Sequence, residues 1–250
     1  MEKWNMYDIF EQGESIIAGS TQKDDRFFYD FSLSLYAGDD KEKIKSNREI
    51  FREAFPEEYG LVSFYQIHSD KVIDISEYKS FSGWLESDIE ADGIVTTQKG
   101  VVLATLGADC LSLLMYDKEA GVIGAAHSGW RGTAQNIAKN LFETMQKHGA
   151  KAERTLCSIT PGIRECCYEV GSEVVEHFKK YPSSFTKKSN GKYMFDNAEV
   201  NYLRLLEMGF KKENIEVSDI CTGCSTERFF SYRKESGCRG RFMNYIAMKP

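Results

Sequence analysis

The amino-acid sequence predicts one α/β (α+β) domain, spanning residues 1–250, in which a sheet is covered by helices. Four nearly continuous apolar runs follow one another between residues 93 and 127, as expected of strands buried on both faces. The segment after them has the period of an amphipathic helix. Several strands follow one another without a helix between them, which argues against the regular β-α alternation of a doubly wound fold.

The N-terminal third combines strands with one helix. β-Branched and aromatic residues predict strands at 14–20, 26–36, 61–67 and 71–75. A helix is expected over residues 41–55, because Asp39 and Asp40 can cap its start and Pro56 ends it. We interpret residues 78–92 as an excursion or loop.

The central and C-terminal parts alternate between strands and helices. The apolar runs predict strands at 93–97, 101–107, 111–117 and 121–127. The helix after them has one apolar stripe, and Gly149 is well placed to end it. The stripe consists of Ala134, Ile137, Ala138, Leu141, Phe142 and Met145. Further on we expect strands at 154–160, 215–220, 229–233 and 241–248 and helices at 169–181 and 197–209.

Composition and charge limit the classes of partner. The chain has a formal net charge of −6, whereas a broad nucleic-acid surface needs clustered Lys and Arg. No apolar run approaches the roughly 18 residues of a membrane span, and the N-terminus lacks a signal-peptide core. We therefore expect a cytoplasmic protein with no nucleic-acid and no membrane partner. The oligomeric state stays open.

Seven cysteines are many for this length. Because the number is odd and no export signal is visible, free thiols, metal ligands or a catalytic thiol fit better than a disulfide framework. Cys221 and Cys224 form a CxxC, which can bind zinc or act as a redox pair. The other close pair, Cys166 and Cys167, is adjacent, and neighbours in an extended chain point apart. We favour a packed turn for the CxxC over a redox role.

Two of the four histidines directly follow apolar strands, where loops present functional side chains from a rigid frame. These are His68 in FYQIHSD and His127 in GAAHSGW, and Cys110 follows a strand in the same way. Imidazole and thiolate are ligands that zinc prefers, and three protein ligands with one position for water are typical of catalytic zinc. The residues therefore indicate a zinc site, with buried packing residues as the alternative. His148 and His177 lie in helical segments, where capping contacts or solvent account for them.

Several motifs together resemble the YfiH family. They are YQIHSDKV, ADGIVTT, LGADCLSLLMYD, VIGAAHSGWRGT, YEVGSEV and FFSYRK followed by GR, and the resemblance extends from SNRE near residue 47 to RFMNYI near residue 245. Members of this family were first called laccase-like polyphenol oxidases and are now described as purine nucleoside phosphorylases. The resemblance implies mixed β-sheets between helix layers. It also implies zinc ligands at the histidine of QxH, the cysteine of ADC and the histidine of HxGW, here His68, Cys110 and His127.

The resemblance further implies an activity. A family member of this type is a zinc-dependent purine nucleoside phosphorylase, which converts adenosine, inosine or 5′-methylthioadenosine to free base and ribose 1-phosphate, with adenosine deaminase as a second activity and copper as a substitute metal. The chain departs from the family where it has TPGI (160–163) in place of the usual GPCI and CTGC in place of the common CTCC. Neither change removes a matched ligand, and the first bears on substrate specificity.

Phosphorolysis needs a seat for phosphate and a group that moves a proton. Arg131 lies at the start of the expected helix, where main-chain amides and a guanidinium together bind phosphate well. Arg48 in SNRE matches a family arginine and can join it. Asp109 and Asp70 are the first candidates for general acid or base. The other two candidates are Asp92 and Glu169.

The stretch AAHSGWRG (125–132) then joins a metal ligand to an anion site through one turn. We expect Gly129 to permit this turn because glycine tolerates positive φ, and Ser128 or Thr133 to cap the helix. Trp130 can wall the pocket, stack on a base or pack in the core.

Three alternative functions stay open. Cys110 as thiolate and His127 as base would be the nucleophilic pair of a thiol hydrolase or deamidase. A copper-dependent phenol oxidase fits poorly, since electron relay to oxygen needs more histidine ligands than the two credible ones. A non-enzymatic zinc-binding or partner-binding module is the third.

Overall fold

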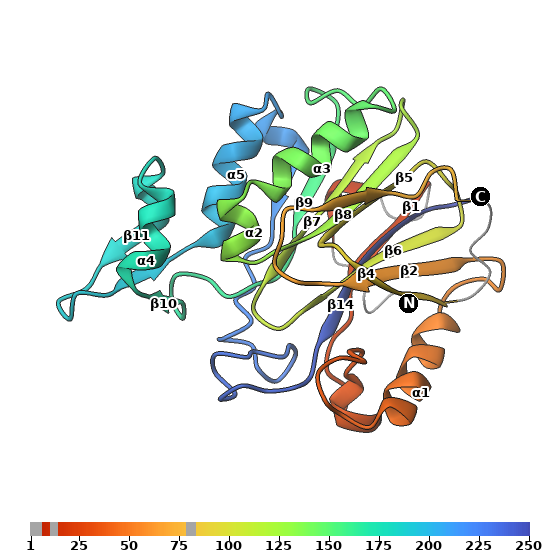
Figure 1. Cartoon of the computed structure of the whole chain (residues 1–250), viewed down its shortest axis with the longest axis horizontal. Helices are drawn as coiled ribbons and strands as arrows, with labels where there is room; N and C mark the ends of the chain where they lie inside the picture. The colour runs from red at the N-terminus through yellow and green to blue at the C-terminus, as the bar shows by residue number, and fades with distance from the viewer. Residues whose placement is uncertain (1–6, 11–14, 79–83) are drawn as a thin grey trace.

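Two β-sheets packed face to face form the centre of the molecule, and helices cover their outer faces (Figure 1). The structure is a computed structural model and describes residues 7–10, 15–78 and 84–250. The first sheet has the strand order β1-β14-β6-β2-β4, and the second has the order β13-β9-β7-β8-β5-β3. The expected α/β class, with mixed sheets between helix layers, is confirmed.

Both sheets mix parallel and antiparallel pairs. In the first, β14 pairs antiparallel with β1 and β6, and β2 pairs parallel with β6 and β4. In the second, β9, β7, β8 and β5 are antiparallel neighbours, and β13 and β3 add parallel edges. The first sheet consists of β1 (Ile16–Ser20), β2 (Gly60–Tyr65), β4 (Trp84–Glu90), β6 (Val101–Gly107) and β14 (Phe242–Met248). The second consists of β3 (Val72–Asp74), β5 (Gly93–Thr96), β7 (Leu111–Asp117), β8 (Val122–Ser128), β9 (Leu156–Ile159) and β13 (Ile215–Val217).

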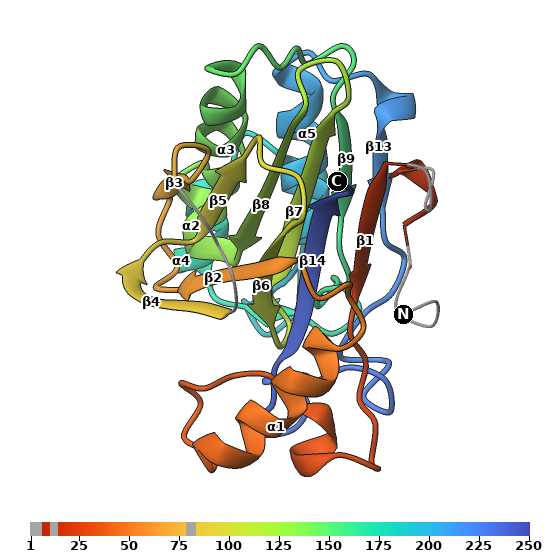
Figure 2. The same cartoon turned by 90° about the vertical axis from the view of Figure 1, so that its right-hand side faces the viewer.

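Helices (Figure 2) and a third, small sheet (Figure 1) complete the fold. The α-helices are α1 (Lys41–Arg52), α2 (Trp130–Ala134), α3 (Ile137–Gln146), α4 (Ser172–Val175) and α5 (Asn197–Glu207). The small sheet has the order β10 (Glu169–Val170), β12 (Tyr193–Phe195) and β11 (Phe185–Lys187). None of the helices in the described ranges combines the length and apolar character that a membrane crossing requires.

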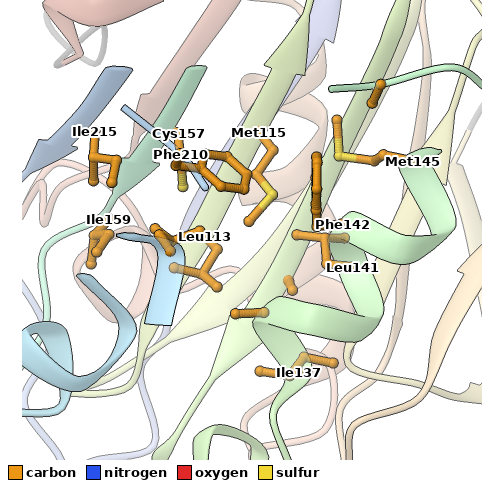
Figure 3. Close-up of a cluster of buried hydrophobic side chains, with 14 of the residues drawn as sticks. Leu113, Met115, Ile137, Leu141, Phe142, Met145, Cys157, Ile159, Phe210 and Ile215 are labelled. Atoms are coloured by element: carbon orange, nitrogen blue, oxygen red, sulfur yellow. The ribbon is translucent and has the colours of Figure 1, made fainter. Parts of the chain in front are cut away.

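Alternate residues of the central strands enter different cores. On β7, Leu114 faces the core between the two sheets, whereas Leu113 and Met115 face the helix layer. There they pack with Leu141 and Met145 of α3 (Figure 3). β6, β7 and β8 are buried along their whole lengths, which explains why their sequences are almost continuously apolar. The prediction of strands buried on both faces is confirmed.

Most predicted elements are present within one to three residues. The helix stripe is confirmed but divided, because Asn136 adopts a left-handed conformation (φ 68°) between α2 and α3. Asparagine tolerates this conformation better than most residues. Asp40 caps α1, as expected, by accepting a hydrogen bond from the main-chain N–H of Glu42.

The strand predicted at residues 26–36 is wrong. The chain instead forms a 3-10 turn at Phe28–Phe31 and then an irregular stretch that buries Phe31 and Leu33 beneath α1. The side-chain amide of Asn47 donates to the carbonyls of Phe28 and Ser32 at 2.7 and 2.9 Å. The apolar side chains are thus buried as in a strand. Two of the backbone carbonyls, however, accept hydrogen bonds from a helix side chain and not from a neighbouring strand.

Three further predictions need correction. Residues 78–92, expected as a loop, include β4, which pairs in parallel with β2, and residues 79–83 of that range lie outside the described residues. Residues 169–181 do not form one helix but a short strand, α4 and a 3-10 turn at Glu176–Phe178. Residues 229–233 form turns and no strand. Two of their groups, the Ser231 hydroxyl and the Arg233 main-chain N–H, donate to Asp109 in the site described next.

Candidate metal centre and substrate pocket

The three residues singled out at strand ends meet at one edge of the sheets. His68 lies on the connection from β2 to β3 and Cys110 on that from β6 to β7, so both lie where the chain crosses from the first sheet to the second. His127 is in β8. One ligand atom from each lies within 4.8 Å of the others, and Cys110 Sγ is 4.0 Å from His68 Nε2.

A buried carboxylate, Asp92, holds two of these residues in place. Its Oδ1 lies 2.8 Å from Nδ1 of His127, and its oxygens accept main-chain N–H bonds from Ile67, His68 and Ser69 at 3.2, 3.1 and 2.7 Å. The bond to Nδ1 leaves Nε2 of His127 available to a metal, which is the usual arrangement behind metal-binding histidines. These contacts fit a positioning role for Asp92 better than the acid or base role that the sequence suggests.

Charge at the site favours the thiolate of Cys110. Burial alone would raise the pKa of this thiol, but hydrogen bonds and charge from His127 and His68 lower it. Burial would lower the pKa of His127, and Asp92 and Cys110 together raise it. The thiolate is the form of cysteine that binds metals and attacks electrophiles, so the site suits either chemistry.

Backbone conformations at the site are unusual. His68 has φ 61° and Asp109 has φ 93°, a region that non-glycine residues seldom adopt and that is concentrated at functional sites. The Asp109 carboxylate accepts hydrogen bonds from Thr222 Oγ1, Ser231 Oγ and the Arg233 main-chain N–H at 2.7, 2.6 and 2.7 Å. These bonds fix the backbone that presents Cys110 and occupy the carboxylate, which argues against the predicted proton-transfer role.

Gly129 fits closely between the candidate ligands. A Cβ at this position would lie 2.9 Å from Cys110 Sγ and 3.0 Å from His68 Cδ2. Its φ is −70°, so the expectation that it needs positive φ is wrong, and the close approach explains the glycine instead. Ser128 and Thr133 do not cap the helix, since their hydroxyls bond to each other at 2.8 Å.

We expect Gly129→Ala to lower zinc affinity by about tenfold or more, because the added methyl forces a candidate ligand out of position. Competition with a chromophoric chelator measures this affinity. Gly121→Ala is the control: its added Cβ meets no atom within 4 Å, and because Gly121 has a left-handed φ of 61° the change should cost stability but leave the zinc affinity unchanged. Equal affinities for wild type and Gly129→Ala would contradict this account.

The donor set and its surroundings fit a zinc-type ion. Two imidazoles and a thiolate are ligands that zinc accepts, one imidazole is oriented by a carboxylate, and the glycine leaves the ligands room to converge. Three protein ligands beside a cavity are typical of a site that keeps one position for water or substrate.

The candidate ligands line a cavity of about 580 Å³, a size suited to a small molecule. Its walls include three arginines, Arg131, Arg233 and Arg241. Arg131 lies with its guanidinium 4.6 Å from the Trp130 ring centre. The aromatic walls are Tyr36, Tyr65, Trp130, Tyr168 and Tyr232. Cations and exposed aromatic faces therefore surround the candidate ligands.

The other predicted site residues lie elsewhere. Arg48 is buried in α1 and donates from Nε to the carbonyl of Leu33 at 2.7 Å; it is not among the residues that line the cavity, although Ser34, next to Leu33, is. Asp70 accepts from the Asn140 amide at 3.0 Å and also lies outside the cavity lining. The carboxylate of Glu169 is bound by Lys188 and Lys192, which lower its pKa to about 2.

Sequence reasoning did not identify Arg233 or Arg241 as site residues, although both belong to the FFSYRK and GR motifs. Nor did it bring Cys166 and Cys167 together with Cys221 and Cys224. The structure does, with one sulfur of each within 4.8 Å of the other three.

The family described as "Multi-copper polyphenol oxidoreductase laccase" matches residues 20–249. The chain belongs to this family. The match covers both sheets apart from most of β1, and it includes every residue of the candidate centre. It agrees with the resemblance drawn from the motifs, because solved structures named YfiH and YlmD share the fold.

Relatives of this laccase-type family carry two kinds of enzyme name. Purine nucleoside phosphorylase YlmD of Geobacillus stearothermophilus is 32% identical over 234 residues, covering 89% of this chain and 85% of that protein. Adenosine deaminase RL5, from an unknown prokaryotic organism, is 31% identical over 259 residues, covering 100% of this chain and 99% of that protein. The crystal structure of Bacillus licheniformis YfiH, a hypothetical protein, superposes with a TM-score of 0.83 at 27% identity, covering 94% of this chain and 93% of that one.

Proposed function

We propose that this chain is a zinc-dependent purine nucleoside phosphorylase that cleaves adenosine or a related nucleoside with inorganic phosphate. The observation that carries the proposal is the convergence of His68, Cys110 and His127 in a cavity that also holds three arginines. The name of the YlmD relative supports it. We further propose that residues 1–250 act as one catalytic domain, since both sheets contribute to the centre.

The arginines are the proposed phosphate site. The guanidinium of Arg131 is exposed, stacks on Trp130 and has no hydrogen bond to the described residues. Arg233 lies 5.1 Å from the Tyr168 ring centre at the same cavity. Because α2 is a helix of five residues, its dipole adds little, and the proposal depends on the guanidiniums. We propose Arg233, in place of the expected Arg48, as the partner of Arg131 in phosphate binding.

Phosphorolysis replaces one bond at C1′ of the ribose with another. A phosphate oxygen attacks C1′ of the ribose, the bond from C1′ to the purine nitrogen breaks, and the purine leaves with a proton. Zinc at the centre supplies Lewis-acid polarisation of an oxygen or an acidified water. The chain contributes cations for the phosphate and tyrosine faces, such as those of Tyr65 and Tyr232, for the purine.

Adenosine deamination is the second candidate activity. This reaction replaces the 6-amino group of adenosine with an oxygen from water and releases ammonia; a metal bound to the same three residues would supply the activation of that water. The name of the RL5 relative supports it. Phenol oxidation with several coppers suits the chain poorly, because the other histidines are committed elsewhere. His148 is 2.5 Å from Asp74, and His177 lies beside Trp130.

Product analysis with zinc-loaded protein and adenosine tests the proposal. We expect adenine and ribose 1-phosphate to form only when phosphate is present. Arg131→Ala should raise the KM for phosphate by about 10–100-fold, as expected for the loss of one charge-assisted hydrogen bond. Arg26→Ala removes an exposed arginine paired with Asp24 and is the control. Inosine as the product irrespective of phosphate would make deamination the main activity, and no product would overturn both.

A further inference from the structure

We propose that Cys166, Cys167, Cys221 and Cys224 bind a second, structural zinc ion that fastens two loops along one wall of the substrate cavity. The four sulfurs lie within 4.8 Å of one another. They share no residue with the His68–Cys110–His127 centre. Nothing in the proposed phosphorolysis requires them.

The distances between the sulfurs suit thiolates around one ion. Cys224 Sγ lies 3.4 Å from Cys167 Sγ and 3.6 Å from Cys166 Sγ. A tetrahedral zinc with bonds of about 2.3 Å separates its sulfurs by about 3.8 Å. A disulfide would bring two of them to about 2.05 Å. The observed separations are close to the first value and far from the second.

Local turns explain how adjacent cysteines can both face one point. The expectation that Cys166 and Cys167 point apart assumed an extended chain. Instead the main-chain N–H groups of Cys167 and Tyr168 both donate to the carbonyl of Arg164, at 2.9 and 3.0 Å, which makes a tight turn. A turn brings neighbouring side chains to one side, where an extended strand separates them.

The second loop is shaped in the same way. The N–H groups of Cys224 and Ser225 donate to the carbonyl of Cys221, each at 3.1 Å, so that the two ends of the CxxC converge. A Cβ on Gly223 would lie 2.9 Å from the Cβ of Cys167, so glycine is needed for the loops to meet. The main-chain N–H of Arg164 also points at Cys221 Sγ, 3.4 Å away, a contact that stabilises a thiolate.

The location indicates what the ion would do. Thr222, inside the CxxC, donates to the Asp109 carboxylate at 2.7 Å, and Asp109 precedes Cys110. Tyr168, next to Cys167, lines the cavity. Fastening these loops therefore holds both a cavity wall and the backbone that presents a candidate catalytic-site ligand.

Metal counting on the intact chain tests the proposal. Protein purified with zinc and analysed by mass spectrometry of its metals should carry two ions per chain. Cys110→Ser should keep one, the double variant Cys166→Ser/Cys224→Ser should keep the other, and the triple variant should keep none. Cys238→Ser is the control, since this thiol lies outside both clusters, and should keep two. One ion in the wild type, lost with Cys110→Ser, would overturn the proposal.

Cobalt substitution gives a second readout, in which all four cysteines of the cluster stay intact. Cobalt-loaded Cys110→Ser should show the intense sulfur-to-cobalt absorption and the visible bands of a tetrahedral thiolate site. Absence of these bands, or an intact mass two hydrogens lighter that marks a disulfide, would contradict a metal site. Since this assay needs no nucleoside, its failure is distinct from a failure of the phosphorylase proposal.

Discussion

Cys110→Ser is expected to lower kcat/KM for adenosine phosphorolysis by about 10³-fold or more. The serine hydroxyl is a far weaker zinc ligand than the thiolate, and metal polarisation of a reacting oxygen is worth several kcal/mol, where each 1.36 kcal/mol is tenfold in rate. Kinetics on purified protein, with its zinc content measured, check the prediction. Activity near the wild-type level without bound zinc would contradict it.

The same residue separates the metal enzyme from a thiol hydrolase. If zinc is the catalyst, a chelator should abolish activity and zinc should restore it. The zinc-bound thiol should resist alkylation, whereas the metal-free thiol should react faster than an ordinary cysteine at neutral pH, because the pKa of Cys110 is lowered. An activity that survives the chelator and is lost on alkylation would identify the thiol as nucleophile.

Asp92→Asn should lower zinc affinity by about 10–100-fold, with activity falling in parallel at limiting zinc. The amide keeps the size of the side chain but cannot accept all the hydrogen bonds that the carboxylate receives from the His127 ring and from the loop at His68. Chelator competition measures the affinity.

Asp117→Asn is the matched control for this variant. Asp117 is also a buried carboxylate, bonded to Arg154 at 2.8 Å, but it lies at the far end of β7 from Cys110. Its replacement should reduce stability and leave zinc affinity as in wild type. If both variants bound zinc equally well, Asp92 would be a folding residue only.

The central strands and the helix stripe could be predicted because the pattern of apolar side chains along each segment alone indicates its secondary structure and its buried faces. β6 to β8 are buried on both faces, so a polar residue there is costly unless it is hydrogen-bonded, and the resulting, mostly apolar runs are visible in the sequence. The segment 26–36 failed for the opposite reason. Its apolar residues are buried, but its backbone bonds to Asn47, and no local pattern reveals such a partner.

Residue type and strand-end position predicted the candidate ligands. They did not predict the residue that positions them. His68, Cys110 and His127 have the chemistry of ligands, whereas the role of Asp92 depends on bonds to residues 24 to 35 positions away. Arg48 matched a motif, but it is a buried residue of α1 whose guanidinium bonds to the Leu33 carbonyl. The convergence of four cysteines needed two turns from distant parts of the chain, which spacing cannot indicate.

His68 and Cys110 both lie on connections between the two sheets, so an ion held between them is a cross-link within the fold. Opening either sheet would release it, and metal binding then adds to the free energy of unfolding. At free zinc 100 times above the dissociation constant this addition is about 2.7 kcal/mol. If zinc is that ion, the thermal stability of the protein should rise with the zinc available to it.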